Sequence, residues 1–252
     1  MPRLALLVVL MTLLGAGALA QSPEQLFQEG NALYQQGKLD EALTRYQAIL
    51  DRGFVSGELL YNIGNVHYRS GRIAEAILFY ERALRRMPQD EDLRHNLQMA
   101  NLLITDRIEP TPRLFFWDFW DGLKNAFSPA GITWLTYLLY LLTLGSLAAF
   151  VLVRSYRMKR LTLLGSAAAG VLMLLGLVVA VAKISDLTRT DEAIVMDAVV
   201  TVKNSPDERS SDAFVLHSGT KVRMTDSVAD WVEIRLADGK VGWITRESVE
   251  PV

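Results

Sequence analysis

The stretch GNALYQQGKLDEALTRY at residues 30–46 returns, altered but in register, as GNVHYRSGRIAEAILFY at residues 64–80. Two glycines, an asparagine, a Glu-Ala pair and two tyrosines recur between the copies at an offset of 34 residues. A fixed period of this length is typical of solenoids, in which each unit is a pair of helices that stacks on the next. We therefore divide this part of the chain into the units 23–56 and 57–90.

The recurring residue types have physical reasons. A glycine or alanine at a helix crossing lets two backbones approach, and a glycine just past a helix end accepts the left-handed cap conformation. We assign Gly30 and Gly64 to the crossings and Gly37 and Gly71 to the caps. The closing tyrosines are expected to fill the gap between helix pairs.

The period and the pattern resemble the tetratricopeptide repeat family. The resemblance implies an all-α solenoid over residues 21–109, closed by a helix at 91–105 that is either a degenerate third repeat or a capping helix. It also implies that peptides or protein segments bind in the groove lined by the first helix of each pair. The candidate groove residues are Phe27, Asn31, Tyr34, Tyr61, Asn62, Asn65, Tyr68 and Arg69.

Some members of that family clamp a peptide carboxylate with lysine, arginine and asparagine. This chain keeps Asn31 and Asn62 at corresponding positions, but it has Phe27 in place of the first lysine and Asp92 and Asn96 in place of later basic residues. The sequence thus departs from the clamp pattern. The alternative for each groove side chain is a solvated or purely structural role.

Three apolar blocks account for the high hydrophobic content of 50%. Residues 1–20 have the basic start, short apolar core and small residues at the end that are typical of a secretory signal peptide, the alternative being an uncleaved anchor. Residues 132–153 and 161–182 carry no charge and are long enough to cross a bilayer. The alternative for these two segments is a pair of helices buried in a soluble core, but the rest of the chain is too small to surround them.

The sequence predicts which side of a membrane each part occupies. The expected turn at residues 154–160 contains four cationic residues, which favours the cytoplasmic side. Both flanking regions would then be extracytoplasmic, and the signal peptide independently exports the N-terminal half. We therefore expect a multi-pass protein of a bacterial inner membrane with both folded modules on the periplasmic or extracytoplasmic side.

An aromatic segment precedes the first expected span. Residues 114–120 read LFFWDFW, and aromatic side chains of this kind settle at the headgroup level of a bilayer. We interpret residues 110–131 as an interfacial segment. A binding role for the aromatic cluster is the alternative.

After an expected linker at 183–192, the pattern changes from the helical period to alternation. Residues 231–236 alternate apolar and polar, and Asp238-Gly239 is a hairpin signal. We expect a small closed barrel of about five strands. The segments Trp231–Ile234 and Gly242–Ile244 resemble the bacterial SH3-like domain family over residues 193–252, which implies binding of cell-wall peptide or protein ligands. Trp231 and Trp243 are the candidate ligand platform; alternatively, they pack against the loop at 207–212.

Signs of catalysis are missing from the sequence. The chain has no cysteine, and its three histidines lack metal-binding or catalytic spacing. Phosphate-binding, dinucleotide-binding and nucleophile-elbow motifs are absent, and the net charge of −2 gives no electrostatic case for nucleic acid. We predict no enzyme activity, no cofactor and no metal.

The order of the parts resembles the BatE-type family of the bacterial aerotolerance operons. That resemblance implies a scaffold in an aerotolerance or stress-related membrane complex, with other membrane or exported proteins as partners, including von Willebrand A domain proteins of the same operon. The competing interpretation is a peptidoglycan-binding protein that acts through the SH3-like domain.

Overall fold

The computed structural model describes residues 21–109, 111, 114–188 and 191–252. It divides into two compact units, one holding the chain up to Ile108 together with Asp191–Val252, the other Glu109–Thr190. The expected signal peptide at 1–20 lies outside the described residues and remains a prediction.

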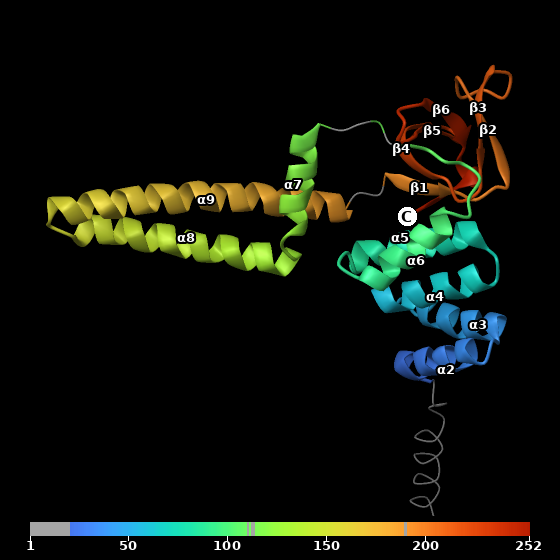
Figure 1. The fold of residues 1–252 in the computed structure, drawn as a ribbon, viewed down its shortest axis with the longest axis horizontal. Coiled ribbons are helices and arrows are strands. Elements are labelled where there is room, and N and C mark those ends of the chain that lie inside the picture. The colour runs from blue at the N-terminus through green and yellow to red at the C-terminus, as the bar shows by residue number, and fades with distance from the viewer. Residues whose placement is uncertain (1–20, 110, 112–113, 189–190) are drawn as a thin grey trace, which may run out of the picture. The chain divides into compact units, whose positions relative to one another are not determined.

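Five helices stack in chain order in the first unit (Figure 1). They are α2 (Pro23–Gln35), α3 (Leu39–Leu50), α4 (Gly57–Arg69), α5 (Ile73–Arg86) and α6 (Glu91–Asn101). Ser22, Ser56 and Asp90 cap α2, α4 and α6 by accepting a backbone N–H two or three residues into the helix, as their position before each first turn predicts. The expected closing helix is therefore present but ends at Asn101 rather than at residue 105.

The repeated glycines have the expected roles. Gly37 and Gly71 have φ of 78° and 76°, the left-handed conformation of a helix end. A Cβ on Gly30 would lie 2.5 Å from the ring of Tyr46, and one on Gly64 would lie 2.5 Å from the ring of Tyr80. Each tyrosine thus fills the crossing within its own pair, and it also packs in a core shared with neighbouring helices.

The C-terminal module is a seven-stranded antiparallel sheet. Its strands are β1 (Glu192–Val195), β2 (Val199–Lys203), β3 (Asp212–His217), β4 (Lys221–Val228), β5 (Trp231–Arg235), β6 (Val241–Thr245) and β7 (Val249–Pro251), with a 3-10 turn η1 at Arg246–Ser248. The Asp238-Gly239 hairpin signal is confirmed, because Gly239 has φ of 94° between β5 and β6.

The expected closed barrel is wrong. The strand order is β3-β2-β6-β5-β4-β1-β7, and within residues 191–252 no pairing joins β3 to β7. β2 meets β6 at the single pair Lys203 and Trp243, whereas it pairs with β3 along its whole length. The β2–β3 hairpin therefore forms one edge of an open sheet, and alternation alone could not reveal which strands would fail to pair.

The helices α2 to α6, which we call the repeat array, share a hydrophobic core with the sheet. Ile194 of β1 is fully buried in the same cluster as α5 and α6 residues, with Met196 and Val252 packed beside it. Gly219, before β4, lies so close to the array that a Cβ there would meet Ile104 at 2.6 Å. A solenoid end needs covering, and here the C-terminal module covers it.

Ionic contacts surround this shared core. Lys221 lies 2.9 Å from both Glu81 of α5 and Glu192 of β1. Arg82 of α5 pairs with Glu250 at 2.8 Å and donates to the backbone oxygen of Pro251. The two modules are therefore joined through α5, β1 and β7 rather than merely tethered.

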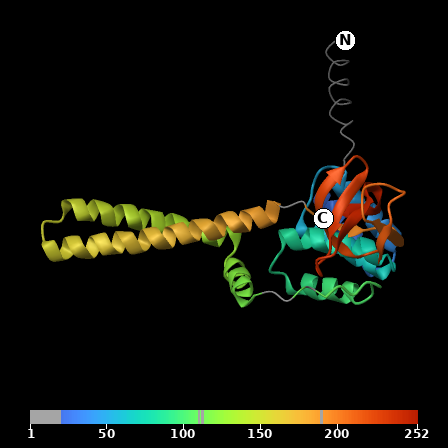
Figure 2. The same ribbon diagram turned by 90° about the horizontal axis from the view of Figure 1, so that it is seen from above.

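The second unit is a helical hairpin with a short preceding helix: α7 (Phe115–Asn125), α8 (Pro129–Leu152) and α9 (Tyr156–Thr188). α8 and α9 lie side by side in both views (Figures 1 and 2). Both helices are long and apolar enough to cross a membrane, with mean hydropathy of 2.0 and 2.4.

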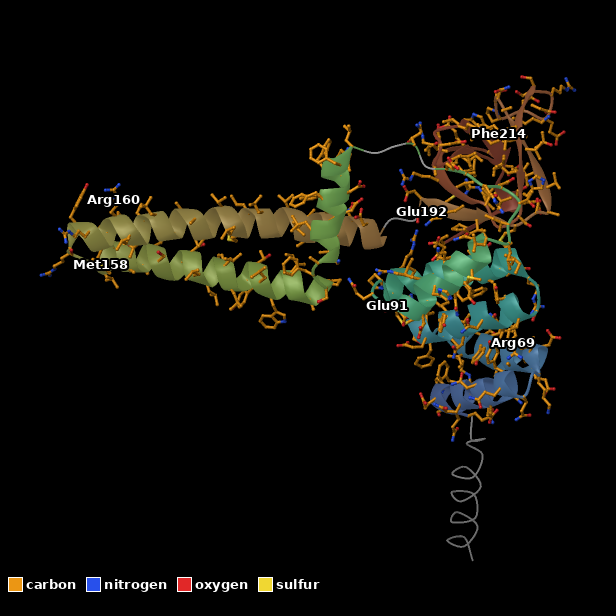
Figure 3. All side chains as sticks on the ribbon, in the orientation of Figure 1. Arg69, Glu91, Met158, Arg160, Glu192 and Phe214 are labelled. Atoms are coloured by element: carbon orange, nitrogen blue, oxygen red, sulfur yellow. The ribbon has the colours of Figure 1, made fainter. Side chains whose placement is uncertain are left out.

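Two expected boundaries in this unit are wrong. The basic turn placed at 154–160 is mostly helical, because α9 begins at Tyr156, and Met158 and Arg160 lie on the helix beside the bend (Figure 3). The linker placed at 183–192 is largely helical too, since α9 continues to Thr188. Charged residues at a helix end look like a turn in a hydropathy pattern, although they can continue the helix.

Small residues line the contact between α8 and α9. Cβ atoms on Gly165, Gly170 and Gly176 would face Ser146, Thr143 and Thr136. Ser146 donates to the backbone oxygen of Thr162 at 2.7 Å across the two helices. The large side chains point outward, as Leu138 and Leu142 illustrate with 59% and 60% exposure.

The aromatic segment forms α7 and packs on this hairpin. Trp120, Leu123 and Phe127 contact a small core made by Ile132, Val179 and Ala180. Phe115 and Phe119 of α7 are 83% and 72% exposed. The segment therefore has apolar side chains that contact the helical hairpin and others that do not.

Candidate functional site

A chain of asparagine side chains links the first helices of the repeats. Asn31 of α2 accepts through Oδ1 from the Tyr46 hydroxyl at 2.7 Å and from Asn62 Nδ2 of α4 at 2.9 Å. The same arrangement returns one repeat later. Asn65 of α4 accepts from the Tyr80 hydroxyl at 2.8 Å and from Asn96 Nδ2 of α6 at 3.1 Å.

The tyrosine hydroxyls stay protonated and can therefore donate these bonds. Burial raises the pKa of Tyr46 to about 12, and burial raises the pKa of Tyr80 above its ordinary value as well. Both phenols are therefore neutral at physiological pH, and each donates to the Oδ1 of its asparagine.

An open pocket of about 310 Å³ lies at the asparagine chain, lined by Asn31, Tyr34, Gln35, Tyr46, Asn62 and Asn65. Asn31 and Asn65 each accept two of these hydrogen bonds through Oδ1. Side-chain amides that line an open pocket can bond to the carbonyl and N–H groups of an extended peptide.

The other predicted groove residues take different positions. Arg69 lies 4.7 Å from the ring centre of Tyr34 and donates to the Tyr34 backbone oxygen at 3.1 Å, so it joins α4 to α2. Arg69 lies at the end of α4 (Figure 3). The Tyr61 hydroxyl accepts from Asn96 at 2.8 Å. Tyr68 packs against the core shared by α5 and α6.

Phe27 is the predicted groove residue that lies apart from the asparagine chain. Its ring contacts Tyr46 at 6.0 Å and lines a second, apolar pocket with Ile49 and Leu59. The residues that sequence reasoning left out of the site are Asn96 and the two phenol hydroxyls. The offset of 34 could have found Asn96, because it repeats Asn62, whereas nothing in the pattern says that a core tyrosine bonds to a groove asparagine.

The two candidate indoles share the outer face of the sheet. Glu233 of β5 pairs with Trp243 of β6, and Trp231 pairs with Thr245, so the tryptophans are diagonal neighbours on adjacent strands. Both side chains are half-buried. Lys203, opposite Trp243 on β2, donates to Ser210 and Asp212, which places Trp243 beside the base of the β2–β3 loop. Their role as a ligand platform remains a prediction.

Two of the histidines, His67 and His217, contact side chains from other parts of the fold. His67 stacks on Phe79 at 5.3 Å and accepts from Arg72, and burial lowers its pKa. His217 has a partner that its sequence neighbourhood does not contain: Asp106, from the segment after α6, lies 2.7 Å from its Nδ1. Among the described residues, no group of three or more His, Cys, Asp or Glu could hold a metal ion.

Asp106 connects the array to the sheet. Its carboxylate also accepts from the His217 backbone N–H and from the Thr220 hydroxyl, each at 2.7 Å. Burial raises the pKa of Asp106, but the hydrogen bonds from Thr220 and His217 outweigh burial and the pKa is lowered overall. The carboxylate is therefore held in its charged form.

Two family matches agree with this geometry. Residues 27–91 match the tetratricopeptide repeat family, and residues 198–250 match the bacterial SH3 domain family. The chain contains both modules. Domains of these two kinds are typically binding modules rather than catalysts. No curated protein gives a match to the chain.

Proposed function

We propose that this protein is a membrane-anchored scaffold whose repeat groove binds an extended segment of another protein. The observation that carries the proposal is the open pocket lined by Asn31, Asn62 and Asn65, two of which the Tyr46 and Tyr80 hydroxyls hold in place. Repeating donors on a rigid concave surface recognise a peptide backbone with little dependence on its side chains.

Membrane anchoring is the second part of the proposal. In the most apolar 18-residue stretch of α8 no residue is buried. In the corresponding stretch of α9 only 28% of the residues are buried. A core helix of a water-soluble protein would be mostly buried, since large exposed apolar surfaces are unstable in water. We propose that lipid covers these faces and that the exposed Phe115 and Phe119 of α7 lie in the headgroup region.

A binding assay on the full chain in lipid nanodiscs tests the groove. Asn65→Ala removes the groove donor, and Tyr80→Phe removes the same tyrosine–asparagine bond but keeps the amide. We expect crosslinked partner segments to be lost with Asn65→Ala and reduced less with Tyr80→Phe, because the amide remains although its phenol partner is gone. Capture by Asn65→Ala at the wild-type level would show that the groove amide does not bind the partner.

The sidedness is testable because the chain has no natural cysteine. We propose that the basic bend is cytoplasmic and both modules are extracytoplasmic. A membrane-impermeant maleimide should then label Ser210→Cys in intact spheroplasts, whereas Ser155→Cys should label only after permeabilisation. Labelling of Ser155→Cys in intact cells would reverse the topology.

The indole face supports a second candidate function, binding of cell-wall peptide. The contacts with the array come from β1, β7 and residues 217–221, whereas Trp231 and Trp243 lie on β5 and β6. Trp231→Ala, with Arg235→Ala on the same face as its control, should reduce sedimentation with purified peptidoglycan if this function is correct. Unchanged sedimentation would remove it.

The order of the modules resembles the BatE-type family, and on that basis we propose an aerotolerance or stress-related membrane complex as the setting. The partners would include proteins with von Willebrand A domains. Crosslinking in native membranes followed by mass spectrometry tests this assignment, and capture of murein alone would contradict it.

A further inference from the structure

An apolar pocket of about 370 Å³ opens at the N-terminal end of the groove helices. Its walls come from the start of α2, the end of α3, the α3–α4 loop and the start of α4. The apolar lining residues are Pro23, Phe27, Ile49, Phe54, Val55 and Leu59. The carboxylates of Glu24 and Glu58 also line it.

The α3–α4 loop holds apolar side chains out towards solvent. Phe54 and Val55 are 55% and 42% exposed. Their backbone is nevertheless fixed, since Phe54 N–H donates to the Ile49 oxygen at 3.3 Å and Gly53 has φ of 79°. Exposed apolar residues on an ordered loop are characteristic of interaction sites.

The rim of the pocket is negative. Glu24 and Glu58 occupy equivalent positions in the two repeats, and Asp92 takes the same position on α6. In the described ranges none of these three carboxylates forms an ion pair, although Glu24 accepts from the Gln28 amide at 2.8 Å. The helix dipole accounts for acidic residues in a first turn, but it also leaves their charge available to a ligand.

The pocket lies one helical turn from the asparagine groove along both α2 and α4. Phe27 lies one helical turn before Asn31 on α2, and Glu58 lies one turn before Asn62 on α4. A segment whose backbone meets the asparagine amides would therefore reach the pocket with a side chain two or three residues further along.

We propose that this pocket binds an apolar side chain of the segment in the groove and that the adjoining residue of that segment is a lysine or arginine. The inference rests on the proposed peptide-binding function and specifies the chemistry of the partner. The apolar side chain is covered by Phe27, Phe54 and Val55, and its cationic neighbour lies between Glu24 and Glu58. An acidic neighbour would meet two like charges.

The expected preference is moderate because the carboxylates are exposed. One exposed ion pair changes affinity by about two- to fivefold, so two carboxylates should favour a basic over an acidic neighbour about tenfold at low salt. Covering an apolar side chain should add about another tenfold over a serine. The charge preference should shrink as salt rises, whereas the apolar preference should not.

The test uses the full chain in nanodiscs and synthetic fluorescent nonapeptide libraries. The central pair of residues is fixed as Leu-Lys, Leu-Glu or Ser-Lys, and the other positions are random. We expect the protein to retain more of the Leu-Lys library than of either the Leu-Glu or the Ser-Lys library. Glu24→Gln/Glu58→Gln should bring Leu-Lys down to the level of Leu-Glu, and Phe54→Ser/Val55→Ser should bring it down to the level of Ser-Lys.

Matched controls separate this inference from the proposed function. Glu29→Gln changes a carboxylate on α2 that pairs with Arg45 instead of lining the pocket, and it should leave the preference intact. Equal retention of the three libraries by the wild-type protein, with all retention lost in Asn65→Ala, would overturn the pocket assignment and leave the groove function standing. Retention of no library at all, or equal retention by empty nanodiscs, would overturn both.

Discussion

The repeat array and the helical hairpin both bring helices close together at glycines, but they arrange the remaining side chains in opposite ways. In the array the glycines face buried tyrosine rings, and the core is made of residues such as Ile63 and Leu93 that are fully buried. In the hairpin the glycines face serine and threonine, and the leucines point outward. The array places its apolar groups as water requires, whereas the hairpin places them as a lipid environment allows.

The largest expected effect comes from an outward-facing leucine of the hairpin. Leu142→Asp replaces a side chain that is 60% exposed. In water this change would cost little, but at the centre of a bilayer an aspartate costs about 3 kcal/mol. We expect reduced membrane insertion, measured as the fraction resistant to alkaline extraction. Full insertion would mean that this face does not meet lipid.

A glycine substitution in each region sharpens the comparison. Gly64→Ala places a Cβ 2.5 Å from the Tyr80 ring and should lower the free energy of unfolding of the array by about 2 kcal/mol, since the packed ring must move. Gly170→Ala places its Cβ 3.8 Å from Thr143, an ordinary contact, and should leave the hairpin unaffected. Hydrogen exchange on α4, α5 and α9 measures both, and a tolerated Gly64→Ala would contradict the crossing geometry.

We expect the contact between the array and the sheet to depend on pH through Asp106. Its pKa is lower in the folded than in the unfolded chain, so its stabilisation is complete above the unfolded value of about 4 and is lost as the pH falls through the folded value. Asp106→Asn should cost about 1.5 kcal/mol at neutral pH. Hydrogen exchange of β1 should be faster in Asp106→Asn than in the wild type at neutral pH, and the two rates should approach each other in acid. A difference that does not change with pH would argue against a charged Asp106.

The smallest expected effect concerns the Tyr46 hydroxyl, which donates to the groove residue Asn31. Tyr46→Phe removes one donor to Asn31 while leaving the ring against Gly30, and it should cost about 1 kcal/mol of stability. Thermal unfolding followed through the helix signal of the array measures this cost. No change in stability would indicate that water replaces the phenol without loss.

Sequence reasoning located the elements well where the pattern is periodic. The 34-residue offset correctly predicted both helix pairs and the glycine caps, because each depends on local spacing. It failed at the sheet edge and at the ends of α9. Whether β3 pairs with another strand, or whether Arg157 and Lys159 continue a helix, depends on contacts or energies that hydropathy does not contain.

The sequence by itself determined that the chain holds a repeat array, two long apolar helices and a small β module, since periodicity and composition follow from which faces each element must bury. Only the tertiary structure decided that array and sheet form one unit. Asp106 with His217, Glu81 with Lys221 and Ile77 with Gly219 are more than a hundred residues apart, and no short-range pattern relates them. The same is true of the groove: local spacing places the asparagines, and their hydrogen bonds to buried tyrosines of the second helices appear only in the tertiary structure.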